Sequence, residues 1–469
     1  MGLVSFEFLV LLGIAALVYR AVPRRTRPTF IALASYAFYL TWNVRMAVVL
    51  FVVTLVVYLA GRRLQRLGGS SAAARLVAIT VSALVVYLGI FKGAEALHRN
   101  EGVLIPLGLS YYTFKLISYV IDVYWGTIAA ETNFANFAAY VAFFPQIVAG
   151  PIQRASDFLS QVSQARLPGR EMLLSGISRI LLGCFKKLAV ADTLSELVNY
   201  GFAHSAGPAG LPRLMAFYVF PIQLLADFSA LTDIAIGAAR LFGIESPENF
   251  DAPYSAVSIS AFWRRWHMTL TQWLRDYVFT PLRMRWRNLG NVGLAASLTV
   301  NMVLIGLWHG FTLAFVVFGL VHSVYLIIDA LTSQFRKRQY RQHPRLDAIT
   351  TWLGPVVVFH LVCIADVFFR TPSFVDGLRI VIRLYSGLMV SIAGTVSAIH
   401  PVAWLGVGGY VVVEVLDFIR RRTPESYITT APRWIRWSAT SCAAVLTLFF
   451  LAVLLARQTT VNPFVYAIF

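Results

Sequence analysis

The chain has 469 residues, of which 58% are hydrophobic and only 13% are charged. Soluble globular domains are about 45–50% apolar and about 25% charged, so this composition excludes a soluble multidomain protein and indicates a polytopic membrane protein. Lys and Arg outnumber Asp and Glu by 40 to 22, which gives a net charge of +18. We expect most of this surplus in cytoplasmic loops, with some basic residues left for an anionic ligand, and we expect no nucleic acid.

Continuous apolar segments recur along the chain, and a membrane-spanning helix needs about 20 such residues. The candidates are centred near residues 11, 36, 53, 84, 112, 141, 218, 300, 321, 359, 388, 408 and 446. Some are short, so we predict an all-α protein with about eleven transmembrane helices plus interfacial and re-entrant helices. The arginines follow the first segment, residues 4–18, rather than precede it, which favours a retained span over a cleaved signal.

Four clusters of basic residues separate the apolar segments, at residues 20–27, 62–75, 336–345 and 420–436. Short loops of this composition belong in the cytoplasm. Two apolar segments lie between the first two clusters, and two crossings return the chain to the same side of the membrane, as that placement requires. Three apolar segments lie between the last two clusters, and three crossings would put these clusters on opposite sides. We therefore expect at least one of the three, near Pro372, to enter the membrane without crossing it.

The middle third of the chain, residues 145–290, differs from both ends because polar residues interrupt its apolar runs. Irregular polar backbone at membrane depth is tolerated only inside protein or beside water. In FFPQIVAGPIQR (143–154), Pro145, Gly150 and Pro151 predict a break in the helix next to Gln146. Candidate functional residues are therefore expected in this third.

Two carboxylates, Asp227 and Asp233, stand in otherwise apolar surroundings. Buried carboxylates need partners, and the arginines at positions 264, 265 and 275 are the expected ones. The alternative for each aspartate is a solvated loop face.

Residues 258–282, read as one helix, place aromatic and polar residues on two neighbouring stripes. The first stripe holds Trp263, Trp266, Leu270, Trp273 and Tyr277, and the second holds Arg264, His267, Thr271 and Arg275. This pattern is typical of a helix at the membrane interface. A plain amphipathic anchor is the alternative, but it gives no reason for a histidine between arginines.

His309 lies between two apolar runs in GLWHGFTLAFVVFGLVHS (306–323). An ionisable residue at such depth is a candidate for function, and Gly306 and Gly310 allow another backbone or a substrate to come close. A structural histidine bonded to a carbonyl is the alternative. For His322 we favour a packing or hydrogen-bonding role.

Several stretches resemble the membrane-bound O-acyltransferase (MBOAT) family, in particular its bacterial alginate O-acetyltransferase branch and the D-alanyl-transfer proteins of teichoic acid modification. The matching stretches are IPLGLSYYTFKLISYVIDVYWG (105–126), AFFPQIVAGPIQR (142–154), the run from residue 227 to 282, LIGLWHGFTLAFVVFGLVHS (304–323) and DVFFRTPS (366–373). We therefore predict a single MBOAT membrane domain over 1–469, with N-terminal helices in 1–100, the family core and its site in 100–375, and C-terminal helices in 376–469.

The resemblance implies a multi-pass enzyme of the bacterial inner membrane that moves an acetyl group from a cytoplasmic thioester donor, through a tunnel, to an extracytoplasmic hydroxyl. The family's invariant histidine corresponds to His309 and its second polar position to His267. We expect His309 to act as general base, because burial favours the neutral imidazole, and His267 to position the acceptor or the thioester carbonyl. A covalent acyl-histidine is a variant of this mechanism.

The expected acceptor is a polysaccharide or a partner acetyltransferase, and the expected donor is acetyl-coenzyme A or an acyl-carrier thioester. We expect no bound cofactor. We also expect no disulfide framework and no metal site, because Cys184, Cys363 and Cys442 are few, far apart and set in apolar stretches. Candidate substrate- or donor-binding residues are Arg264, Arg265, Arg275, Asp227, Asp233, Trp266, Thr271, Gln146 and His322, with the pair Lys186–Lys187 as a further phosphate site.

Two alternatives remain open at this point. D-alanyl or other acyl transfer from an acyl carrier protein is one, and a non-catalytic transporter is the other, although no internal repeat supports a transporter. The run Arg283-Met284-Arg285-Trp286-Arg287 departs from the Gly-Gly-Asn-Arg turn usual in the alginate branch. We therefore expect contacts with the donor or a partner to differ from those of the alginate branch, and the core reaction to be the same.

Overall fold

The computed structural model describes residues 4–97, 105–203, 211–371, 373–384, 406 and 408–410. These residues form helices joined by turns, with no β-strand within the described ranges, which confirms the all-α prediction. By their contacts, these described residues divide into two compact units, one within 1–183 and 231–248 and the other within 184–230 and 249–469. The single domain over 1–469 remains a prediction.

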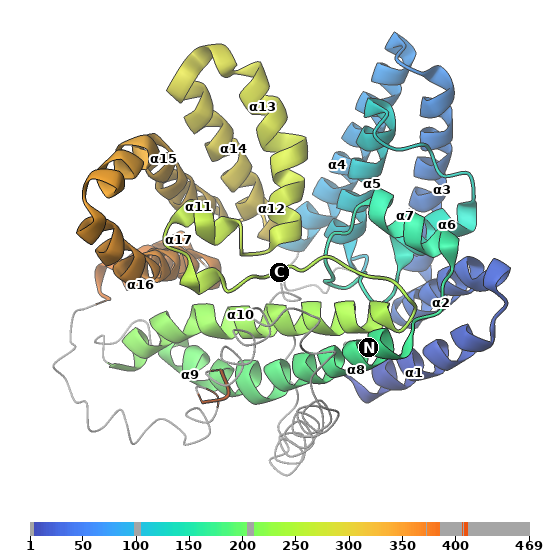
Figure 1. The fold of residues 1–469 in the computed structure, drawn as a ribbon, viewed down its shortest axis with the longest axis horizontal. Helices are drawn as coiled ribbons and strands as arrows, with labels where there is room; N and C mark the ends of the chain where they lie inside the picture. The colour runs from blue at the N-terminus through green and yellow to red at the C-terminus, as the bar shows by residue number, and fades with distance from the viewer. Residues whose placement is uncertain are drawn as a thin grey trace. The chain divides into compact units, whose positions relative to one another are not determined.

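The first unit contains the helices from the N-terminus to residue 183. They are α1 (Phe6–Ala21), the 3-10 turn η1 (Arg24–Thr26), α2 (Arg27–Trp42), α3 (Val44–Leu67), α4 (Ser71–Leu97), α5 (Leu109–Trp125), α6 (Phe134–Ala142), α7 (Ala155–Gln164) and α8 (Arg170–Phe185). Local signals set their ends: at the start of α3, Asn43 Oδ1 accepts from Met46 N–H, and Gly68 ends the helix at φ +55°. Helices α3, α4 and α5 pack side by side (Figure 1).

The second unit contains most of the remaining elements. They are the π-helix η2 (Lys186–Ala191), α9 (Asp192–Ala203), the first twenty residues of α10 (Leu211–Arg240), η3 (Pro253–Ser255), α11 (Ile259–Trp263), α12 (Met268–Leu274), the π-helix η4 (Arg275–Phe279), α13 (Thr280–Arg285), η5 (Arg287–Leu289), α14 (Gly290–His309), α15 (Leu313–Gln342), α16 (Pro344–Arg370) and α17 (Phe374–Ile382). Helices α14, α15 and α16 pack in succession (Figure 1).

Six helical segments of the described residues are long and apolar enough to cross a membrane: Val44–Leu67, Ser71–Leu97, Arg213–Arg240, Arg287–His309, Leu313–Gln342 and Pro344–Arg370. Large apolar side chains such as Val48, Phe51 and Val56 are exposed along α3, as lipid contact requires. These observations support a multi-pass membrane protein. The total of about eleven remains a prediction, because the segments near 388 and 446 and most of that near 408 lie outside the described residues, as do Pro372 and Cys442.

Two local expectations have different outcomes. The break near Pro145 is confirmed, since α6 ends at Ala142 and helix resumes only with α7. The composition of the basic cluster 336–345 predicts a loop, which is wrong: the cluster forms the last turns of α15 and the first residues of α16, with only His343 between the two helices. Apolar residues end before Arg336 while helix propensity continues, so the helix extends beyond its apolar part.

Candidate functional site

Residues 258–282 do not form the single helix that the sequence suggests. Helices α11 and α12 are separated by a turn at residues 264–267, in which His267 adopts a left-handed backbone with φ 42°, and η4 interrupts the helix again. Two tertiary bonds hold this turn: Asp251 N–H donates to Arg265 O (2.9 Å) and Met268 N–H donates to Asn249 O (2.8 Å). The predicted continuous stripes are therefore wrong, because contacts with residues 249–251 override the helical period.

His267 points inward from this turn, toward Asn249. The Asn249 Oδ1 atom accepts from Thr269 N–H (3.2 Å) and Thr269 Oγ1 (2.9 Å) and lies 3.0 Å from His267 Nδ1. The backbone N–H identifies this amide atom as the oxygen, so Nδ1 of His267 must donate and its Nε2 carries the lone pair. The ring is 1% exposed, and burial lowers the pKa of His267 to about 3. The imidazole is therefore neutral near pH 7.

His309 ends α14, where that helix turns back into α15. A Cβ on Gly306 would lie 2.1 Å from Phe315 O, and one on Gly319 would lie 2.4 Å from Met302 O, so the backbones of the two helices touch. This confirms the predicted close approach at Gly306. The buried His309 ring packs 4.7 Å from the ring of Phe369 and 5.9 Å from that of Phe315, measured between centroids.

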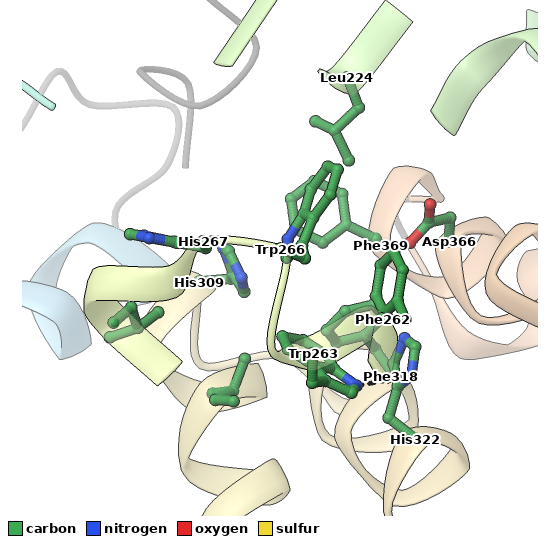
Figure 2. A pocket seen from close by; sticks show the side chains of 12 residues that line it. Leu224, Phe262, Trp263, Trp266, His267, His309, Phe318, His322, Asp366 and Phe369 are labelled. Atoms are coloured by element: carbon green, nitrogen blue, oxygen red, sulfur yellow. Dashed lines mark hydrogen bonds between the residues drawn. The ribbon is translucent and has the colours of Figure 1, made fainter. Parts of the chain in front are cut away.

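A narrow pocket in the second unit brings the predicted histidines together (Figure 2). Aromatic and aliphatic side chains form most of its wall, and the space between them is that of about one water molecule. His267 and His309 both line the pocket, and His322 lies beside Trp263 (Figure 2). The lining residues are Leu224, Phe262, Trp263, Trp266, His267, Leu270, Ile305, His309, Phe318, His322, Asp366 and Phe369.

Asp227 is buried in the second unit but is not a lining residue of this pocket. Its Oδ1 lies 2.9 Å from Lys187 Nζ, and Asp192 Oδ1 lies at the same distance from that nitrogen. Burial raises the pKa of Asp192 to about 6, although Lys187 opposes this rise. The predicted arginine partner of Asp227 is therefore wrong, and Lys187, only 1% exposed, is not accessible as a phosphate site.

Asp233 and Gln146 belong to the first unit. Asp233 Oδ1 accepts from Arg179 Nε at 2.8 Å, so its predicted partners at 264, 265 and 275 are also wrong. The Gln146 amide donates to Gln153 Oε1 (3.0 Å) and Ser246 Oγ (2.6 Å) beside the helix break. The carboxylates find basic partners on α8 and η2, which precede α10, and not on the segment that follows it.

The arginines nearest to His267 in sequence lie outside the pocket wall. Arg264 and Arg275 are exposed, and Arg275 Nε donates to Asp276 Oδ1 at 2.9 Å. Arg265 Nη1 donates to Ser255 Oγ at 2.6 Å. Thr271 Oγ1 donates to the carbonyl of Trp266 at 3.2 Å, and of this set only Trp266 lines the pocket. Their contacts with a donor remain a prediction.

Sequence reasoning did not select Asp366, Trp263 or Phe369 as site residues, although all three line the pocket. The sequence does contain a signal for Asp366, the first residue of DVFFRTPS. It is a carboxylate that directly follows the apolar run of α16. The helical pattern of 258–282 places Trp263 on an interfacial stripe, but the break at 264–267 lets it line the pocket instead. Within the described ranges, no group of three or more His, Cys, Asp or Glu residues could hold a metal ion.

Comparisons with known proteins show the family to which the chain belongs. The model of the MBOAT, membrane-bound O-acyltransferase family, matches residues 128–371, which include both His267 and His309. The chain is similar to the probable alginate O-acetylase AlgI of Pseudomonas putida (30% identity, 94% of each chain) and to that of Pseudomonas aeruginosa (34% identity, 78% of this chain and 70% of the relative). It is also 27% identical to the teichoic acid D-alanyltransferase of Bacillus subtilis over 70% of this chain and 86% of the relative. The chain therefore belongs to the MBOAT family and is a multi-pass membrane O-acyltransferase.

Proposed function

We propose that this enzyme transfers an acetyl group from a cytoplasmic thioester to a hydroxyl of an extracytoplasmic polysaccharide, directly or through a partner acetyltransferase, with His309 as general base. The observation that carries the proposal is the presence of His309 and His267 in one buried, largely apolar pocket. The His309 ring is buried and packs against the rings of Phe315 and Phe369, at the end of α14 where an acceptor could reach it.

His267 is suited to orient the acceptor. Its Nδ1 proton is committed to Asn249, so Nε2 presents a lone pair that can accept a hydrogen bond from a hydroxyl. The same nitrogen cannot polarise a thioester carbonyl unless it gains a proton, and burial opposes that. Of the two roles expected for His267, the tautomer therefore favours positioning of the acceptor hydroxyl.

The names of the pseudomonad relatives, alginate O-acetylases, support acetyl as the group and a polysaccharide as the acceptor. D-alanyl transfer from a carrier protein is the second candidate, favoured by the name of the Bacillus subtilis relative.

For the donor we propose an anionic thioester, either acetyl-coenzyme A or a carrier-bound acetyl group, and for the location the bacterial inner membrane. The exposed guanidinium of Arg264, three residues before His267, can form charge-assisted bonds to phosphates. A net charge of +18 attracts either donor.

The test uses His309→Ala and His309→Gln, with His343→Ala on the exposed turn between α15 and α16 as control. Purified protein is given acetyl-coenzyme A, and thiol release is measured together with the acetyl content of the surface polymer in cells. Both His309 variants should lose at least 100-fold in turnover, as expected for loss of a general base, while the control keeps wild-type values. Normal acetyl content with either His309 variant would exclude the proposed base.

Two further measurements identify the substrates. Comparing acetyl-coenzyme A with an acetylated carrier protein as donor separates the two sources of thioester. Mass spectrometry of surface glycans from cells with and without the gene identifies the polymer, and D-alanyl in place of acetyl on that polymer would replace the first candidate by the second.

A further inference from the structure

His322 occupies the pocket with its ring orientation fixed by a neighbouring tryptophan (Figure 2). Trp263 Nε1 lies 3.3 Å from His322 Nδ1, and the two rings are nearly perpendicular, at 80°, with centroids 5.0 Å apart. The His322 ring is 1% exposed and also packs edge-on against Phe318, 4.8 Å away. Trp263 and Phe318 thus hold the imidazole in one place.

The hydrogen bond with Trp263 determines which nitrogen of His322 carries the proton. An indole N–H is a donor and never an acceptor, so His322 Nδ1 must accept and cannot be protonated while this bond exists. A neutral imidazole carries one proton, which therefore lies on Nε2. No residue in the described part of the chain hydrogen-bonds this Nε2, and His322 lines the pocket. The pocket thus holds an N–H donor available to a ligand.

We propose that His322 is a catalytic hydrogen-bond donor, whose Nε2–H stabilises the oxygen of the thioester carbonyl as negative charge develops on it, and that Trp263 is the residue that positions it. This inference rests on the proposed acyl transfer. It complements His267, whose bond to the Asn249 oxygen places the proton on Nδ1 and leaves Nε2 as an acceptor.

The step balances without a further reactant. The acceptor hydroxyl oxygen forms a bond to the carbonyl carbon while its proton passes to His309, and the carbonyl oxygen becomes an oxyanion bonded to His322 Nε2–H. The carbon–sulfur bond then breaks, the carbonyl re-forms, and the thiolate receives the proton from His309. His322 keeps its own proton throughout, because it acts as a donor and not as a base.

The test compares His322→Gln with His322→Asn in purified protein, by thiol release from acetyl-coenzyme A. The longer amide of Gln can present an N–H near the position of Nε2, whereas Asn reaches only the position of Nδ1. We expect Gln to stay within about tenfold of the wild-type kcat and Asn to lose about 100-fold or more with little change in KM, as for removal of one oxyanion donor. Equal kcat values for the two variants would overturn the proposal.

The Trp263→Phe variant tests the positioning residue, and Trp273→Phe, another buried tryptophan outside the pocket wall, is its matched control. We expect about a fivefold loss of kcat for the first variant and none for the second, since a single hydrogen bond maintains the tautomer. Equal kcat values for Trp263→Phe and its control would show that Trp263 does not position His322.

A spectroscopic readout keeps this inference separate from the proposed function. The ¹⁵N spectrum of histidine-labelled protein, assigned by the signal lost in His322→Gln, shows which nitrogen carries the proton whether or not the enzyme turns over. A proton on Nε2 that becomes mixed between the two nitrogens in Trp263→Phe supports the assignment. A proton on Nδ1 in the wild type refutes it, whereas inactivity of His309→Gln concerns only the proposed base.

Discussion

Replacement of His267 by Asn should remove an acid-sensitive part of the protein's stability. The His267 ring is 1% exposed, and burial lowers its pKa to about 3, whereas histidine in an unfolded chain has a pKa of about 6.5. Below pH 6.5 the unfolded chain therefore binds a proton that the folded protein accepts only near pH 3. Stability falls as the pH falls through this window. Asn is a suitable replacement because it tolerates the left-handed backbone at this position.

The size of the effect follows from the two pKa values. At pH 5.0, about 1.5 units below the pKa of the unfolded histidine, proton binding stabilises the unfolded state by about 2 kcal/mol. Near pH 7.5 this stabilisation is almost zero. Between these pH values the wild type should lose about 2 kcal/mol more unfolding free energy than His267→Asn, measured by denaturation in detergent. His343→Asn, at an exposed position, should keep the wild-type dependence. Equal losses in the wild type and His267→Asn would mean that the folded protein protonates this ring.

Three other variants test the packing around the site. Gly306→Ala places a Cβ 2.1 Å from a carbonyl of α15 and should lower the melting temperature of the purified protein, whereas Gly89→Ala, with nothing within 4 Å, should leave it unchanged or raise it. Lys187→Met leaves buried carboxylates without their cation and should lower the free energy of unfolding by about 3–5 kcal/mol. Adding Asp227→Leu should recover part of this loss, measured as a double-mutant cycle. Asn249→Leu removes the acceptor of three hydrogen bonds and should reduce both stability and the kcat of thiol release.

Features that depend on local chemistry could be predicted from the sequence. The break after Ala142 follows from Pro145, whose ring cannot continue a helix, and the long helices follow from uninterrupted apolar runs. The contact of two backbones at Gly306 follows from the absence of a side chain. Each depends on a few consecutive residues, so no tertiary information is needed to foresee it.

Features that depend on distant segments could not be predicted in this way. Asp227 pairs with a lysine 40 residues earlier in the chain, and nothing in the intervening sequence distinguishes that lysine from the arginines that follow. The turn at 264–267 exists because backbone groups near Asn249 bond to it, although the sequence from 258 to 282 has a helical pattern throughout. In both cases a tertiary contact outweighs the local preference.

The histidines of the pocket show why residue type alone does not give a mechanism. In the sequence, His267 and His322 are the same side chain in similar aromatic surroundings. In the fold, an amide oxygen faces Nδ1 of His267 and an indole N–H faces Nδ1 of His322, so their protons lie on opposite nitrogens. Acyl transfer needs both an acceptor for a hydroxyl proton and a donor for an oxyanion, and one side chain type can supply both only if its neighbours differ. Asn249 and Trp263 provide that difference, and exchanging the donor or acceptor character of either neighbour should impair turnover even with all three histidines intact.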